Sequence, residues 1–227
     1  MHILILLLLL MALIVGPGLW VQAIMKRHSL PKNRYRRTGG GLARELLDSM
    51  SLGHVGTETT EKGDHYDPIE KVVRLSKPNF DGKSLTALTV AAHEVGHAMQ
   101  DADTYRPLAW RTRLVRWVVP IQKAGAALLM LAPFSAALTR VPTIGILTFF
   151  GGMATLATTI LVHALTLPTE FDASFNRALP VLKQRRILRP EDLPGARRIL
   201  TAAAMTYVAG ALQSLVNIAR WWAILRR

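Results

Sequence analysis

The sequence predicts a mainly α-helical membrane protein with about four transmembrane helices and a small α+β region on the cytoplasmic side. Half of the 227 residues are hydrophobic and the formal net charge is +13, which fits neither an ordinary soluble domain nor a disordered chain. Long apolar stretches also alternate with basic clusters, as in membrane proteins whose cytoplasmic flanks are rich in Lys and Arg. The absence of cysteine excludes disulfides and any thiolate metal site.

The first apolar stretch, residues 3–25, is uncharged and long enough to cross a bilayer once. We expect a retained transmembrane helix rather than a cleaved signal peptide, because no charged segment precedes it and no small-residue cleavage pattern follows Trp20. Seven basic residues within 26–44 then predict a cytoplasmic flank in contact with the lipid bilayer. Nucleic acid is not an expected partner of this run, since Tyr35 is its sole aromatic residue.

Residues 40–116 are expected to form a soluble region on the cytoplasmic side of the membrane. Helical spacing of leucines predicts an amphipathic helix over 42–50, and alternation predicts a short strand over 71–76. A second helix is predicted over 85–100, because Ser84 suits an N-cap and the residues up to Ala92 are apolar.

An H-E-x-x-H motif, formed by His93, Glu94 and His97, lies within this second helix. The helical period of 3.6 places both imidazoles on one face, one turn apart, where they can hold one tetrahedral Zn²⁺. Glu94 would lie beside the metal and act as the general base. Gly96 costs a helix about 1 kcal/mol relative to alanine, which indicates that a neighbouring chain or a substrate approaches closely there. The motif lacks a third ligand.

The chain after the motif predicts three further apolar segments. Residues 117–165 are expected to be a transmembrane hairpin of two helices, and residues 168–198 a basic, helical cytoplasmic segment. Residues 199–219 form a fourth apolar stretch that either spans the membrane or lies at its interface, helped by Trp221 and Trp222. This arrangement places residues 40–116 and 168–198 on the same side of the membrane.

Glu170 is the best candidate for the missing ligand by its position. The predicted hairpin returns it to the side of the metal-binding helix, and Pro168 suits the first turn of a new helix. Asp172, His163, His65 and Asp67 stay open as alternatives on residue type. A glutamate as third ligand corresponds to a zincin-like region of the gluzincin type. The strand at 71–76 would then be an edge strand that pairs with the backbone of a peptide substrate, or part of a small sheet that covers the metal-binding helix.

Six segments of the chain resemble the YugP-like neutral zinc metallopeptidases of bacterial membranes, in order and in spacing. They are residues 64–68, 73–76, 93–101, 105–108, 166–174 and 200–209. The chain is also distantly similar to the HtpX-type membrane zinc proteases. In those enzymes an aspartate follows the ligand glutamate by four residues, whereas Ser174 stands at that position here. Asp172 or Asp64 would have to replace that aspartate in orienting a zinc-bound histidine.

The resemblance implies a multi-pass metallopeptidase of the bacterial cytoplasmic (inner) membrane, with its active site facing the cytoplasm. It implies that His93 and His97 are zinc ligands, Glu94 the general base and Glu170 the third ligand. The expected substrates are membrane proteins or peptides near the membrane surface. Two alternatives stay open from the residues alone: a zinc hydrolase of a non-peptide bond, and a non-catalytic membrane scaffold that retains zinc.

A further donor to the oxyanion is expected, because the tetrahedral intermediate of peptide hydrolysis carries negative charge. His65, Tyr66 and Tyr105 are the candidates, and we hypothesise that His65 lies within reach of the site because it belongs to a polar cluster just before the predicted strand.

Overall fold

The computed structural model describes the backbone of residues 2–225. Within its helices, a set of side chains is left undescribed: residues 2–10, 13–14, 119, 129, 132–133, 136–137, 139, 142, 156 and 216–225. The chain divides into two compact units, which are described separately. The helical unit comprises Met1–Val15, Trp110–Thr166 and Tyr207–Arg227, and the mixed unit comprises Gly16–Ala109 and Leu167–Thr206.

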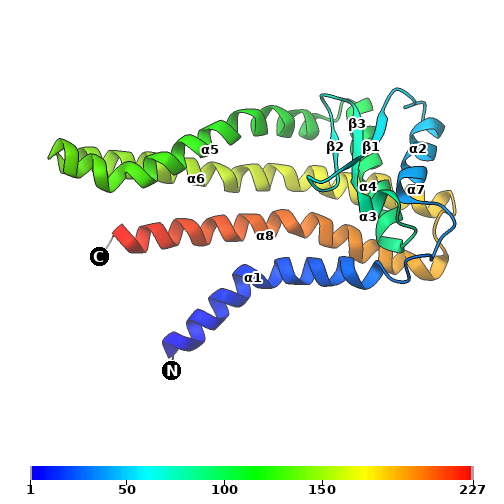
Figure 1. Ribbon diagram of the computed structural model, residues 1–227, viewed down its shortest axis with the longest axis horizontal. Helices are drawn as coiled ribbons and strands as arrows, with labels where there is room; N and C mark the ends of the chain where they lie inside the picture. Colours follow the sequence, from blue (N-terminus) through cyan, green and yellow to red (C-terminus); the bar gives the residue numbers. More distant parts are fainter. Residues whose placement is uncertain (1, 226–227) are drawn as a thin grey trace. The chain divides into compact units, whose positions relative to one another are not determined.

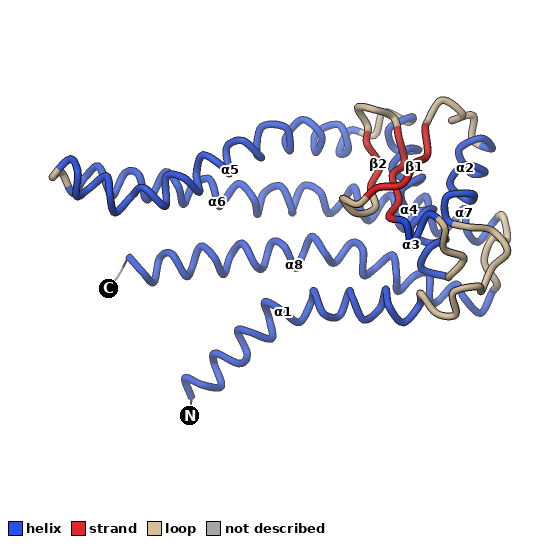
Figure 2. The backbone as a smooth tube through the Cα atoms, viewed as in Figure 1, coloured by secondary structure: helices blue, strands red, loops and turns tan. Residues whose placement is uncertain are grey.

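Parts of four long helices make up the helical unit: α1 (His2–His28), α5 (Arg106–Thr139), α6 (Pro142–Phe171) and α8 (Leu193–Leu225) (Figures 1 and 2). A Cβ placed on Gly125 would lie 1.5 Å from the hydroxyl oxygen of Thr155, so α5 and α6 approach closely at this glycine. The unit exposes many large apolar side chains, including Trp117, Met130, Phe134, Leu138, Leu147 and Leu161. Such a surface is typical of contact with lipid or with another apolar partner.

The prediction of about four transmembrane helices is wrong. Among the residues that the structure describes, one continuous helical stretch is long and apolar enough to cross a membrane: Thr143–Gln184, which comprises most of α6 and the two shorter helices that follow it without a break. The stretches 117–139 and 199–219 belong to the longer helices α5 and α8, which also carry Arg111, Arg113, Arg197 and Arg198. Hydropathy along the sequence detects apolar runs but not the ends of the helices that contain them. The side chains of Trp221 and Trp222 lie outside the described residues.

The mixed unit contains a small sheet and several short helices (Figure 1). Its further elements are α2 (Gly39–Ser49), β1 (Gly56–Thr60), β2 (His65–Asp67), β3 (Val72–Ser76), α3 (Lys77–Phe80), α4 (Leu85–Ala102), the π-helix η1 (Asp172–Ala178), α7 (Leu179–Gln184) and the 3-10 turn η2 (Pro190–Asp192).

The predicted strand at 71–76 is present as β3, but it is central in the sheet. The strand order is β1-β3-β2, with β1 parallel and β2 antiparallel to β3. Both edges of β3 are therefore hydrogen-bonded to neighbouring strands, and β3 has no free edge for a substrate. The sequence pattern of one strand does not reveal how its neighbours pair, which is why this expectation failed.

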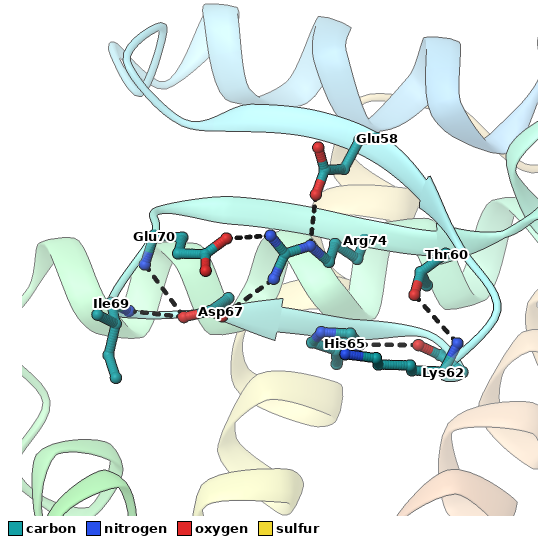
Figure 3. Close-up of polar contacts among 9 residues, drawn as sticks. Glu58, Thr60, Lys62, His65, Asp67, Ile69, Glu70 and Arg74 are labelled. Carbon is teal, nitrogen blue, oxygen red and sulfur yellow. Dashed lines mark hydrogen bonds and ion pairs between the residues drawn. The ribbon is translucent and has the colours of Figure 1, made fainter.

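Arg74 links all three strands through ion pairs (Figure 3). Its guanidinium donates to Glu58 of β1 at 2.5 Å and to Asp67 of β2 at 3.0 Å, and it also pairs with Glu70 in the turn between β2 and β3. The Asp67 carboxylate in turn accepts the backbone N–H groups of Ile69 and Glu70, at 2.8 and 3.1 Å. Arg74 of β3 thus joins both neighbouring strands through side-chain ion pairs.

The helix α4 is the central element of the mixed unit, since every residue from Leu85 to Ala98 is buried. Ser84 is its N-cap, as predicted: the serine hydroxyl accepts the N–H of Ala87 at 3.2 Å. A single core surrounds the helix, to which α2, the sheet, α7 and α8 contribute Leu42, Leu46, Leu47, Val73, Leu75, Leu182, Ile199 and Leu200. A helix buried on all sides can hold its polar residues in a fixed, dry environment.

A close backbone contact joins α4 to the π-helix. A Cβ on Gly96 would lie 2.7 Å from the carbonyl oxygen of Ala173 and 3.3 Å from its carbonyl carbon. These are backbone atoms, so the neighbouring segment cannot turn aside as a flexible side chain would. The close approach that the sequence predicted at Gly96 is therefore present, and the backbone of Ala173 makes it.

We predict that Gly96→Ala destabilises the protein by about 1–3 kcal/mol, because overpacking at this contact outweighs the gain in helix propensity of about 1 kcal/mol. Chemical unfolding of the detergent-solubilised full-length chain measures the change. Gly53→Ala is the matched control, since its Cβ would meet Asp48 at an ordinary 3.7 Å. A Gly96→Ala protein as stable as the control would show that the two segments do not touch through their backbones.

Candidate metal centre

Three buried side chains converge in the mixed unit: His93 and His97 from α4, and Glu170 from the last turn of α6. One ligand atom of each lies within 4.8 Å of those of the other two. The Nε2 atoms of His93 and His97 lie 3.2 and 3.5 Å from Glu170 Oε2, and the two imidazole rings are 4.8 Å apart at their centroids. The exposed fractions are 6, 4 and 2 % respectively, so the cluster is shielded from bulk water.

Glu170 reaches this cluster from the end of a helix and not, as the sequence predicted, from the start of one. Pro168 lies inside α6, which continues to Phe171 and passes directly into the π-helix. A proline is compatible with the first turn of a helix and also with a helix interior that gives up one hydrogen bond, so residue type did not distinguish the two. π-Helical turns occur often at functional sites, where the wider turn redirects side chains.

The carboxyl of Glu170 is ionised in this environment. Burial alone would raise its pKa, but the hydrogen bonds to His93 and His97 outweigh burial and hold the pKa well below its usual range. An ionised carboxylate beside two imidazoles is a suitable set of ligand atoms for a divalent cation.

The outward-facing nitrogen of each histidine is also held. His93 Nδ1 lies 3.1 Å from the hydroxyl oxygen of Ser174, and His97 Nδ1 lies 2.9 Å from Gln100 Oε1. The amide of Gln100 donates to the backbone carbonyl of Thr169 and to Asp172 Oδ2, both at 2.8 Å. Both imidazoles are therefore oriented with Nε2 towards Glu170 and Nδ1 towards a fixed partner.

Asp172 contributes to this arrangement indirectly. Burial acts to raise the pKa of its carboxyl, but hydrogen bonds from Arg177, Gln100 and Asn176 outweigh burial and lower it. Its carboxylate lies next to Gln100 and contacts neither histidine among the hydrogen bonds of the described residues. Asp172 thus reaches His97 through the Gln100 amide.

The other predicted site residues have partners outside the cluster. Asp64 accepts the backbone N–H of Ser76 at 2.6 Å and the amide of Asn79 at 2.7 Å, and so joins β3 to α3. His65 Nδ1 lies 2.8 Å from the carbonyl oxygen of Gly63 in its own turn (Figure 3).

Tyr66 is likewise engaged away from the histidines. Its hydroxyl donates to Asp101 Oδ2 at 2.6 Å, and burial together with that hydrogen bond raises the pKa of the hydroxyl. The guanidinium carbon of Arg177 lies over the ring of Tyr105, 5.8 Å from the ring centroid. Asp67 is paired with Arg74, and His163 belongs to the helical unit. Within the described part of the chain, no hydrogen bond or ion pair joins any of these residues to His93, His97 or Glu170.

Sequence reasoning missed Gln100 and noted Ser174 merely as the absence of an aspartate. Two signals could have found them. Gln100 follows His97 by three residues, so both lie on one face of a helix. Ser174 follows Glu170 by four residues, and its hydroxyl lies 3.1 Å from His93 Nδ1.

The chemistry of the donor set fits a zinc ion. Two imidazole nitrogens and one carboxylate oxygen are typical catalytic zinc ligands, and three protein ligands leave a coordination position open. Among the described residues, no other group of three His, Asp or Glu side chains meets in this way. Glu94 follows His93 in α4 and is buried at 6 % exposure.

Comparison with known proteins agrees with this donor set. Residues 3–226 match the model of a family described as "Putative neutral zinc metallopeptidase". The chain is 35 % identical over 213 residues to a protein of Bacillus subtilis (strain 168) named "Putative membrane protease YugP", covering 91 % of each chain. No solved structure matches the chain. The name of this relative, together with the apolar helical stretch Thr143–Gln184 among the described residues, suggests membrane association. The chain belongs to the neutral zinc metallopeptidase family.

Proposed function

We propose that the protein is a membrane-associated zinc endopeptidase in which His93, His97 and Glu170 hold one catalytic Zn²⁺. The observation that carries the proposal is the convergence of these three buried ligand groups within 4.8 Å. A structural zinc site normally has four protein ligands, whereas a catalytic site has three and keeps one position for water or substrate. The number of ligands therefore favours catalysis over a scaffold role.

The chain's own contribution to the reaction would centre on Glu94. When bound, zinc polarises the scissile carbonyl and lowers the pKa of a water molecule to about 7. Glu94, directly beside His93 on α4, accepts the proton of the attacking water and then donates it to the leaving amine. Its burial keeps bulk water away from that carboxylate, which strengthens its electrostatic interactions.

An extended substrate would pair with β2 rather than with β3. The strand β2 is bonded to a neighbour on one side, and it contacts α4, the helix that carries the histidines. Backbone pairing at such an edge binds many peptide sequences in one geometry. This strand is three residues long, so the pairing would involve a short segment of substrate around the scissile bond.

The proposed substrates are membrane proteins or peptides that lie near the cytoplasmic membrane surface. The first turn of α4 is attached to the end of α1, since Thr86 Oγ1 donates to the carbonyl of Met25 at 3.0 Å. The last turn of α1 carries Lys26 and Arg27, and basic residues of this kind flank apolar helices on the cytoplasmic side. The metal-binding helix α4 is thus hydrogen-bonded to the basic C-terminal turn of α1.

We predict that Glu94→Gln abolishes peptidase activity while the protein still binds one zinc ion. The amide cannot accept the proton of water, and loss of a general base costs about 10²–10⁴-fold in rate. Cleavage of casein and of a membrane-protein substrate, with metal analysis of the same samples, measures both properties. Glu61→Gln, at an exposed position, is the matched control. Wild-type rates in a zinc-loaded Glu94→Gln protein would exclude the proposed mechanism.

We predict that Glu170→Gln weakens zinc binding by at least about tenfold, because a charged ligand is replaced by a neutral and weaker one. Competition with a chromogenic chelator measures the dissociation constant, again with Glu61→Gln as control. Asp172→Asn should weaken binding much less, since Asp172 acts on the site through Gln100. The reverse order of the two variants would identify Asp172 as the ligand.

A further inference from the structure

We infer that Gln100 is a positioning residue, which fixes Nδ1 as the protonated nitrogen of His97 and thereby presents Nε2 to the metal. Gln100 is fully buried, and its Oε1 lies 2.9 Å from His97 Nδ1. A buried amide with three partners has one orientation, and that orientation decides which hydrogen atoms its neighbours must carry.

The orientation of the amide follows from the partners of its nitrogen. Gln100 Nε2 lies 2.8 Å from the backbone carbonyl oxygen of Thr169 and 2.8 Å from Asp172 Oδ2. The carbonyl oxygen of Thr169 can accept a hydrogen bond but cannot donate one, and Asp172 Oδ2 is already an acceptor towards Arg177 Nε. The two donors of the amide therefore face Thr169 and Asp172, and the opposite orientation would set Oε1 against two acceptors.

The protonation of His97 follows in turn. Gln100 Oε1 can accept but not donate, so His97 Nδ1 must carry the hydrogen in their contact. The other nitrogen, Nε2, faces the carboxylate of Glu170, so a hydrogen that it donates there is the one that a metal ion would displace. Three residues that are not themselves metal ligands thus keep the hydrogen on Nδ1 and leave Nε2 as the nitrogen that His97 can offer to a metal ion: Thr169, Asp172 and Gln100.

Asp172 is itself held in place by a cation. Arg177 Nε donates to Asp172 Oδ2 at 2.8 Å, and its terminal nitrogen pairs with Asp103 at 2.5 Å. Asp103 is the C-cap of α4, whereas Asp172 and Arg177 belong to the π-helix. The arginine therefore joins the end of the metal-binding helix to the segment after Glu170 and keeps the acceptor for Gln100 fixed.

The partner of His93 has no such selectivity. Ser174 Oγ lies 3.1 Å from His93 Nδ1, but a hydroxyl donates or accepts with equal ease. The serine can thus follow either tautomer of His93, whereas the amide of Gln100 permits only one state of His97 Nδ1. The two histidines of the motif are held by unequal partners.

The expected loss of zinc affinity rests on the proposed role of His97 as a zinc ligand. The protonation of His97 Nδ1 does not depend on that role. Loss of the partner that orients a ligating histidine typically weakens metal binding about 10–100-fold. We expect a loss of that size for Gln100→Met, which preserves the volume and removes the hydrogen bonds. Gln100→Glu should bind zinc nearly as tightly as wild type, because a carboxylate also accepts from Nδ1–H.

Gln100→Glu separates positioning from a merely structural role. Its second carboxylate oxygen would face the acceptors of Thr169 and Asp172, so the variant should unfold more easily than wild type while it keeps its zinc affinity. If Gln100 only supported the fold, zinc affinity would fall in step with stability in both variants. That result would overturn the inference.

The direct test is nitrogen-15 NMR of the histidine side chains in the zinc-free, full-length protein, with His97→Asn used to assign the signal of His97. We expect a proton on His97 Nδ1 in wild type and in Ser174→Ala, and its loss or rapid exchange in Gln100→Met. An unprotonated Nδ1 in wild type would overturn the inference even if every variant failed to fold. A wild-type protein with Nδ1–H that binds no zinc would instead contradict the proposed function.

Discussion

The backbone contact between Gly96 of α4 and Ala173 of the π-helix is the constraint on which the metal centre depends. His93 and Glu170 are 77 residues apart in sequence, and they meet because the two segments pack without an intervening side chain. A Cβ at position 96 would push the segment that follows Glu170 away from the helix that carries both histidines. One missing methyl group thus allows a set of three ligand groups to form.

The cluster also depends on partners that stabilise the buried negative charge of Glu170. An ionised carboxylate is costly to bury unless it is paired and hydrogen-bonded, and Glu170 has both imidazoles as partners. The histidines are in turn held from outside by Ser174 and Gln100. Each group in this sequence of contacts fixes the next, so the ligand atoms are oriented before any ion binds. Because the ligand side chains are already ordered, metal binding loses less conformational entropy.

Much of this centre can be predicted from the sequence, because its elements follow local rules. The spacing of His93 and His97 fixes their common face, and Ser84 fixes the start of the helix. What could not be predicted depends on contacts between distant segments. The central position of β3, the continuation of α6 through Pro168 and the orientation of the Gln100 amide are all set by neighbours that no sequence window contains. The prediction of about four transmembrane helices failed for a related reason, since apolar runs do not reveal where the helices begin and end.

The most direct test of the account is the position of the bound metal, measured by anomalous diffraction at the zinc absorption edge from crystals of the zinc-loaded protein. The account predicts one peak at about 2.0–2.2 Å from Nε2 of His93, Nε2 of His97 and a carboxylate oxygen of Glu170. A peak coordinated by Asp172 in place of Glu170, or by the Nδ1 atom of His97, would contradict it.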